Sequence, residues 1–503
     1  MPDIIPKLVS SLLDPKRYPH AAKRVKLIET HISWVLLAGR YAYKIKKDVR
    51  LDFLDFSSLK ARLFYCNAEL RLNSRLAKEI YIDVVPIGGS PENPVIGAYP
   101  AIEHAVRMKR FPLNNTFDRL AKSSRLLAEH LDLLADKIAS FHGSLAPAEE
   151  GSGYGKDMIG PIRKSLDELR HHADEDVSLL EKALAAEYAA LEEFLSGRLK
   201  AGYVRECHGD LHLGNIVLFK GKPVPFDCIE FDPRLRWIDV MNEIAFPVMD
   251  LLHHERPDLA LRFLNAYLER TGDYAGLKAF RFFLSGRASV RAMVDAVRGE
   301  PDACRSHLTL AAKFLERPKP FLIITHGLPG SGKTTFSQIA LQKLQAVRIR
   351  SDVERKRIAG LSLFERSGAG LDSGIYAPEA SRTVYTRLLV LAKEILDAGF
   401  PVVVDAAFLD GRERKRFKDL AGNLAVPFAI ASMRAERAAL IARIMGRRND
   451  ASDADLAVFE AKEASLAPLS PEELALACIF ADASDPAGWH SLERHIEPSP
   501  ALC

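Results

Sequence analysis

The 503-residue sequence predicts a two-domain protein, with an α+β bilobal domain followed by an α/β domain that has a parallel sheet. A chain of this length exceeds what one hydrophobic core usually organises. Up to residue 315 the pattern is strands first and helices second, whereas strands and helices alternate from residue 321. Between these two parts of the chain, two prolines in the segment 316–320 interrupt the helical pattern. We expect independently folding domains over 1–315 and 321–503, joined by a linker over 316–320.

Composition places the chain among ordinary globular proteins, with 48% hydrophobic and 27% charged residues. No stretch approaches the roughly 18 consecutive apolar residues of a membrane span, and the N-terminus lacks the basic-then-apolar layout of a secretory signal. We therefore expect a cytoplasmic protein. The six cysteines are far apart without a C-x-x-C pair, which predicts buried free thiols and neither a zinc site nor disulfides. The net charge of +4 is too small for a protein that wraps nucleic acid.

The first part of the chain reads as a sheet with one helix. Two short strands are predicted over 30–39 and 40–47, and the second of them alternates cleanly. Apolar residues at helical spacing then predict a helix over 57–77. Further strands are expected over 81–86, 95–98 and 105–109, and helices over 116–196 and 235–315. This order is what predicts the bilobal α+β domain.

A polar constellation follows the first helices. His208, Asp210 and Asn215 have the spacing H-x-D-x-x-x-x-N, and a hairpin over 216–226 then ends on Asp227. Because a hairpin brings its two ends together, we expect Asn215 and Asp227 to converge on one metal ion with Asp210 nearby. Kinase catalytic loops place a base aspartate, an asparagine and a later aspartate in this order. The structural alternative is a turn that is merely rich in Asp and Asn.

On these residues the sequence resembles the aminoglycoside phosphotransferase family, a kinase-like fold with HGD where protein kinases have HRD. The resemblance covers residues 25–300. It implies that Asp210 orients or deprotonates the acceptor hydroxyl and that Asn215 and Asp227 hold Mg²⁺.

The resemblance also extends to the nucleotide-binding strand. Ala42-Tyr43-Lys44 is similar to the family's A-x-K, which implies that Lys44 is the phosphate lysine and that Glu69 is its ion-pair partner. Lys46 lies on the same face of the predicted strand, so it stays an alternative. The bland alternatives are a solvated lysine and a glutamate on the surface of a helix.

The second domain opens with a phosphate-binding motif. An apolar, β-branched run over 321–325 predicts a buried parallel strand, and the residues after it satisfy G-x-x-x-x-G-K-[ST] before a helix begins. In such a loop backbone N–H groups bind the phosphates, the lysine reaches the β- and γ-oxygens, and the hydroxyl ligates Mg²⁺. The candidate nucleotide-binding residues are Gly327, Gly330, Ser331, Gly332, Lys333, Thr334 and Thr335. The alternative is a glycine-rich turn without a ligand.

Candidate catalytic residues follow later strands of this domain. Asp352 and Arg355 form a D-x-x-R after a strand over 347–351, and Asp405 ends a strand over 401–404 in a Walker-B-like pattern that predicts a metal ligand. A helix over 436–448 places Arg443 and Arg447 on one face before a polar stretch, which suits a lid over the transferring phosphate. A solvated helix face is the alternative.

Over residues 320–503 the sequence resembles small P-loop kinases of the gluconate kinase, polynucleotide kinase and zeta-toxin type, members of the P-loop NTPases. By this resemblance Asp352 holds the acceptor hydroxyl and Arg355 binds its neighbouring group. The two halves in this order are similar to bacterial fusions of an aminoglycoside-phosphotransferase-like domain with an ATP-binding kinase domain.

We therefore expect an ATP- and Mg²⁺-dependent phosphotransferase with two nucleotide sites that transfers the γ-phosphate to a hydroxyl of a small molecule. One alternative is a regulatory protein in which one half only binds nucleotide. Another makes the second half a nucleic-acid end kinase, because of the D-x-x-R and the basic run over 411–418. Salt-sensitive retention on oligonucleotides separates such an end kinase from a small-molecule kinase, whereas Asp210 and Asp352 are the residues that discriminate the regulatory alternative.

Overall fold

The structure is a computed structural model that describes residues 5–51, 54–149, 151–362, 365, 377–445, 456–464, 466–497 and 502. The chain has a two-domain architecture, and it divides into two compact units. The first unit comprises residues 1–161 and 192–250, and the second comprises 162–191 and 251–503. Within the described residues, no helix is long and apolar enough to cross a bilayer.

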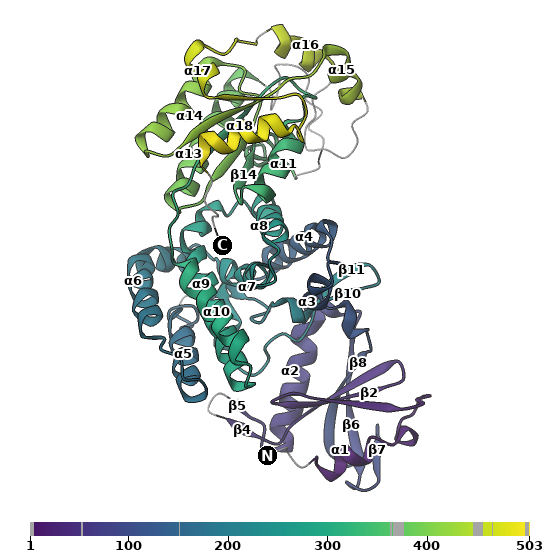
Figure 1. The fold of residues 1–503 in the computed structure, drawn as a ribbon. Helices are drawn as coiled ribbons and strands as arrows, with labels where there is room; N and C mark the ends of the chain where they lie inside the picture. Colours follow the sequence, from purple (N-terminus) through teal and green to yellow (C-terminus); the bar gives the residue numbers. More distant parts are fainter. Residues whose placement is uncertain are drawn as a thin grey trace. The chain divides into compact units, whose positions relative to one another are not determined.

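The first unit is built around an antiparallel sheet, in which Figure 1 labels β2, β6, β7 and β8. The strand order is β1-β2-β3-β8-β6-β7. Its strands are β1 (Val25–Glu29), β2 (Ser33–Ala38), β3 (Tyr41–Lys46), β6 (Tyr81–Gly89), β7 (Pro94–Ile96) and β8 (Ala101–Lys109). The sequence patterns indicate every strand except β1. This edge strand has no fully buried residue, so it lacks the apolar alternation by which strands are recognised.

Helices cover both faces of this sheet. Helix α2 (Leu59–Ala77) packs on one face, and the Ser58 hydroxyl caps it by accepting the N–H of Ala61. The short helix α1 (Lys7–Ser11) packs on the other face through Val9. Two two-residue strands, β4 (Arg50–Leu51) and β5 (Leu54–Asp55), connect the sheet to α2. The first lobe of the predicted bilobal domain is therefore present.

The rest of the first unit carries the polar constellation. It contains α3 (Phe117–Lys122), α4 (Ala128–Ser144), β9 (Val204–Glu206), the hairpin β10 (Ile216–Phe219) and β11 (Lys222–Pro225), β12 (Trp237–Asp239) and most of α7 (Val240–His253). The expectation of unbroken helix from residue 235 is wrong at β12, which pairs antiparallel with β9. Helical periodicity could not reveal this pairing, because the partner strand lies some thirty residues earlier in the chain.

The second unit joins a helical segment to a parallel sheet. The helical segment contains α8 (Pro257–Thr271), α9 (Leu277–Val297) and α10 (Pro301–Phe314), together with most of α5 (Gly160–His172) and part of α6 (Ser178–Lys200). These helices therefore belong to the same compact unit as the P-loop sheet. The linker expected over 316–320 stays a prediction. So does the independent folding of the fragments on either side of it.

The parallel sheet has the order β14-β15-β13-β16-β17. Its strands are β13 (Leu322–His326), β14 (Val347–Arg350), β15 (Val402–Asp405), β16 (Phe428–Met433) and β17 (Ala477–Phe480). Helices α11 (Lys333–Lys343) and α18 (Pro486–Ile496) share one apolar core with it through Phe336 and Trp489. Three further helices pack against the sheet: α12 (Ser351–Ile358), α13 (Pro378–Asp397) and α14 (Gly411–Asn423). Between β16 and β17 the chain forms α15 (Arg437–Met445), α16 (Leu456–Ala464) and α17 (Pro471–Ala475). This is the expected α/β domain.

Candidate active sites

The HGD residues form a tight loop between β9 and β10 in the first unit. Gly209 has a φ of +87°, and a Cβ there would lie 2.7 Å from the carbonyl oxygen of Leu235, so only glycine fits without strain. His208 Nε2 lies 2.9 Å from the carbonyl oxygen of Phe226, while its Nδ1 accepts the N–H of Asp210. Burial lowers the pKa of His208 to about 4. The imidazole is therefore neutral at physiological pH, and its two hydrogen bonds stabilise the loop.

Asn215 and Asp210 are in direct contact. The Asn215 side-chain amide donates to Asp210 Oδ2 at 3.0 Å and to the Asp210 carbonyl at 3.1 Å. His212 Nε2 lies 3.5 Å from the same carboxylate. Because the amide nitrogen is engaged in this way, the Asn215 oxygen is the atom that can ligate a cation. The Asp210 carboxylate is held in one orientation.

Asp227 follows the hairpin and meets Lys44 of β3. Lys44 Nζ lies 2.5 Å from Asp227 Oδ1 and 2.9 Å from Glu69 Oε1. Burial opposes the charge on Lys44, but Asp227 and Glu69 outweigh this effect and raise its pKa well above the ordinary value. The Asp227 N–H donates to the hydroxyl of Tyr81 at 3.2 Å. Asp227, directly after the hairpin, therefore lies against β3.

Lys46 shares the same glutamate. Its Nζ lies 2.8 Å from Glu69 Oε2 and also contacts Glu230, three residues after Asp227. Side chains of Lys46 and Glu69 are fully buried. The contacts therefore distinguish the two lysines between which the sequence could not choose. Lys44 contacts Asp227, whereas Lys46 pairs with two buried carboxylates. Sequence reasoning missed Glu230, since its position three residues after Asp227 is the only feature of the sequence that marks it.

Replacing Glu69 by Leu should destabilise the first domain strongly. Its carboxylate holds two buried ammonium groups, and removing one partner of a buried pair costs about 3–5 kcal/mol. Glu29→Gln is the control, because its pair with Lys47 is half exposed and worth at most about 1 kcal/mol. Differential scanning calorimetry of the full chain measures both variants. Equal small shifts in the first-domain transition would contradict the burial argument.

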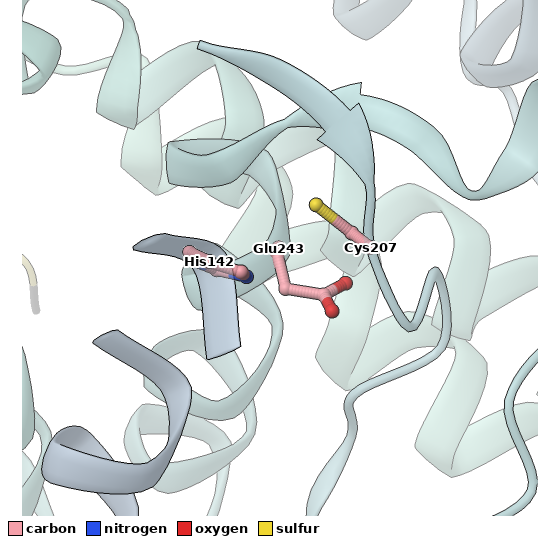
Figure 2. Close-up of side chains that lie close together, drawn as sticks. All are labelled: His142, Cys207 and Glu243. Atoms are coloured by element: carbon pink, nitrogen blue, oxygen red, sulfur yellow. The ribbon is translucent and has the colours of Figure 1, made fainter. Parts of the chain in front are cut away.

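Glu243 of α7 binds the backbone of the HGD loop. Its two oxygens accept the backbone N–H groups of His208 at 2.6 Å and Gly209 at 2.9 Å. Figure 2 shows Glu243 with His142 of α4 and Cys207, three buried groups whose ligand atoms lie within 4.8 Å of one another. These are residue types that bind zinc. Because both carboxylate oxygens already accept hydrogen bonds from the loop, we interpret the group as structural support for it.

The phosphate-binding motif of the second unit lies between β13 and α11. Gly327, Gly330 and Gly332 all have positive φ values, and a Cβ on Gly327 would lie 2.7 Å from the carbonyl oxygen of Met433. Lys333 Nζ donates to the carbonyls of Gly327 at 2.9 Å and Leu328 at 2.8 Å. The lysine side chain therefore folds back over the loop. The loop leads directly into the N-terminus of α11, where backbone N–H groups can bind an anion.

One cavity of about 680 Å³ adjoins this loop. Gly330, Ser331, Gly332, Lys333, Thr334 and Thr335 line it together with Asp352, Asp405 and Arg443. Asp352 lies in the first turn of α12, directly after β14, and Asp405 ends β15 and accepts the hydroxyl of Ser337 at 2.9 Å. Both carboxylates thus stand at the C-terminal ends of parallel strands, where α/β folds place their chemistry.

The structure separates the three predicted arginines. Arg443 of α15 donates to the carbonyl of Gly330 at 3.3 Å. Arg355 is buried and donates to the hydroxyl of Ser381 at 3.3 Å. Arg447 lies outside the described residues. Arg443 is therefore the predicted lid arginine that the structure brings to the phosphate loop.

Lys462 and Arg350 also line this cavity, although sequence reasoning missed both. Lys462 comes from α16, and burial lowers its pKa while Asp352 opposes this shift. Arg350 ends β14 one residue before α12 begins. No motif marks either residue, but the end of a strand after a phosphate loop is the one signal that could have indicated Arg350.

The basic run over 411–418 is neutralised within the domain. Each of its cationic side chains lies within 3.0 Å of a carboxylate: Arg412 with Asp410, Arg414 with Glu473, Lys415 with Asp419, Arg416 with Glu413 and Lys418 with Glu472. Arg414 is almost fully buried. The run therefore does not support a nucleic-acid surface.

Two family models match parts of the chain that include the HGD loop and the phosphate loop. The model described as "Phosphotransferase enzyme family" matches residues 100–280, and the model described as "AAA domain" matches residues 322–469. The recognition made from the motifs is confirmed. The protein is a kinase in which a phosphotransferase domain of the aminoglycoside type precedes a P-loop kinase domain, and such domains use ATP with Mg²⁺.

A relative from Mycobacterium tuberculosis strain H37Rv, described as "Uncharacterized protein Rv2004c", is 32% identical over 414 residues. The alignment covers 78% of this chain and 80% of the relative. Proteins MT2060 of M. tuberculosis strain CDC 1551 and Mb2027c of Mycobacterium bovis match to the same extent. The chain belongs to the family of these mycobacterial proteins.

Solved structures of kinases show weaker similarity. A choline kinase from Cryptosporidium parvum is 14% identical, with coverage of 61% of this chain and 94% of its own and a TM-score of 0.40. A sugar kinase from Janibacter is 16% identical, with coverage of 37% and 98% and a TM-score of 0.29. At these scores neither structure supports a conclusion about the substrate.

Proposed function

We propose that the protein is a kinase with two ATP sites, each of which transfers the γ-phosphate to a hydroxyl group of a small molecule. One observation carries the proposal. In the first unit the Asp210 carboxylate contacts Asn215, a proposed metal ligand, and in the second unit Asp352 lines the same cavity as Lys333, Thr334 and Asp405. Binding a nucleotide needs no such carboxylate, whereas handling the proton of an acceptor hydroxyl does.

In the first domain Lys44 binds phosphate oxygens, and Asp227 with the Asn215 oxygen holds Mg²⁺. Carboxylate and amide oxygens are ligands that Mg²⁺ prefers. When bound, the ion neutralises charge on the β- and γ-phosphates. Asp210, oriented by the Asn215 amide at 3.0 Å, accepts the hydrogen bond of the acceptor hydroxyl and takes its proton during transfer. Glu69 keeps Lys44 charged and in place.

In the second domain the loop N–H groups and Lys333 bind the phosphates, and the Thr334 hydroxyl and Asp405 hold Mg²⁺. Lys333 gives up the carbonyls of Gly327 and Leu328 when phosphate oxygens replace them. Asp352 accepts the proton of the acceptor hydroxyl in the same cavity. Arg443, which reaches Gly330, stabilises charge that develops on the transferred group.

The test is ATP turnover by the full chain against a panel of hydroxyl metabolites and aminoglycosides. Running the panel in Lys44→Ala and Lys333→Ala backgrounds assigns each acceptor to one domain. Acceptor-dependent release of ADP in each background is expected. If one background still binds ATP but phosphorylates no acceptor, the regulatory alternative, in which one half only binds nucleotide, is favoured. Retention of the chain on oligonucleotides that falls steeply with salt would favour the nucleic-acid alternative.

A further inference from the structure

Helix α8 packs on the edge strand β14 of the P-loop sheet. The Asn265 side-chain oxygen accepts the N–H of Arg348 at 2.6 Å, and its amide donates to the carbonyl of Ala346 at 3.3 Å. Asn265 is 1% exposed. Its amide group therefore satisfies the outer edge of β14 much as a neighbouring strand would.

Glu269, one turn further along α8, faces two arginines of the same strand. One oxygen lies 2.7 Å from Arg348 Nη2, and the other lies 4.0 Å from Arg350 Nη1. All three side chains are largely buried. The carboxylate therefore acts on both arginines in surroundings where charges are weakly screened.

Arg350 connects Glu269 to the phosphate site. Its Nε lies 3.7 Å from Oδ2 of Asp405, and its side chain lines the cavity with Thr334 and Asp352. The guanidinium is therefore shared between a carboxylate of α8 and the carboxylate proposed to hold Mg²⁺.

The origin of α8 makes this contact informative. The helix lies in residues 100–280, the segment matched by the phosphotransferase family model, yet it belongs to the same compact unit as the P-loop sheet. A segment with the sequence of the first domain thus supplies contacts beside the phosphate site of the second.

We propose that Glu269 is a positioning residue of the P-loop kinase site. It holds Arg350 away from full pairing with Asp405, so that Asp405 remains available to Mg²⁺. Without the charge of Glu269, Arg350 pairs with Asp405 and competes with the ion. The inference rests on the proposed function of the P-loop site, and it predicts a specific change in the Mg²⁺ requirement.

The experiment uses the full chain in a Lys44→Ala background, with MgATP as the nucleotide and water as the acceptor. Glu269→Gln is expected to raise about fivefold or more the Mg²⁺ concentration for half-maximal ATP binding, measured by calorimetric titration, and likewise that for half-maximal ATP hydrolysis. In an additional Arg350→Ala background, Glu269→Gln should cause no further rise, because the competing cation is gone. Glu269→Asp retains the charge and should give a smaller rise, which keeps the test open if Glu269→Gln folds poorly.

Arg348→Met is the matched control. It breaks the closer ion pair of Glu269 and should lower the melting temperature, but it leaves Arg350 in place and should not raise the Mg²⁺ requirement. An unchanged requirement in Glu269→Gln, or an equal rise with and without Arg350, would overturn the inference. If Lys333→Ala leaves the hydrolysis in the Lys44→Ala background intact, the proposed function of the P-loop site itself fails.

Discussion

Replacing Asp210 by Asn is expected to lower phosphoryl transfer by the first domain by about 10²–10⁴-fold. Asparagine keeps the size of the side chain and its hydrogen bonds, but it lacks the charge that orients the acceptor and takes its proton. Asn215, Asp227 and Lys44 still bind the nucleotide, so the affinity for ATP should hardly change. The rate is measured with the identified acceptor in a Lys333→Ala background, which silences the other site.

Asp352→Asn is the matched control for this experiment, because it removes the corresponding carboxylate of the second site. It should leave transfer by the first domain unchanged, and in a Lys44→Ala background it should lower transfer by the second. Full turnover by the Asp210→Asn variant, with its true acceptor present, would show that Asp210 is not the catalytic residue. The kinase-like interpretation of residues 208–215 would then fail.

The Lys333→Ala variant is expected to lose nucleotide binding at the P-loop while the first-domain site still binds. The ammonium group is the cation proposed to meet the β- and γ-phosphates, and it also donates to two carbonyls of the loop at 2.9 and 2.8 Å. Its removal therefore takes away charge and loosens the loop together. Calorimetric titration with MgATP should show the stoichiometry falling from two nucleotides per chain to one.

Lys343→Ala provides the control at the other end of α11, where the lysine pairs with Glu493 at a half-exposed position. This variant should still bind two nucleotides. A Lys333→Ala chain that binds none would show that the two sites are not separate. One that still binds two would remove the lysine from the proposed site.

The local motifs needed no tertiary information. The phosphate loop and its glycines, the HGD loop with the hairpin after it, and the strand ends at Asp352 and Asp405 are each built from residues close in sequence. Backbone geometry largely determines how such residues lie once the element type is known. For that reason the two-domain architecture and both candidate sites could be predicted from the chain alone, as could the contact between Lys44 and Glu69 through the family resemblance.

The tertiary structure decided the relations between residues that are distant in sequence. It distinguishes Lys44 from Lys46 by their partners Asp227 and Glu230, more than 180 residues away. It also pairs the basic run with carboxylates, and it places Glu269 of α8 beside the strand that leads into the second site. Such pairs follow from how elements pack, which periodicity and motif spacing do not encode. The sequence by itself therefore determined what chemistry each domain carries, whereas packing decided which charges meet, because burial leaves each buried charge dependent on the partner that the fold brings to it.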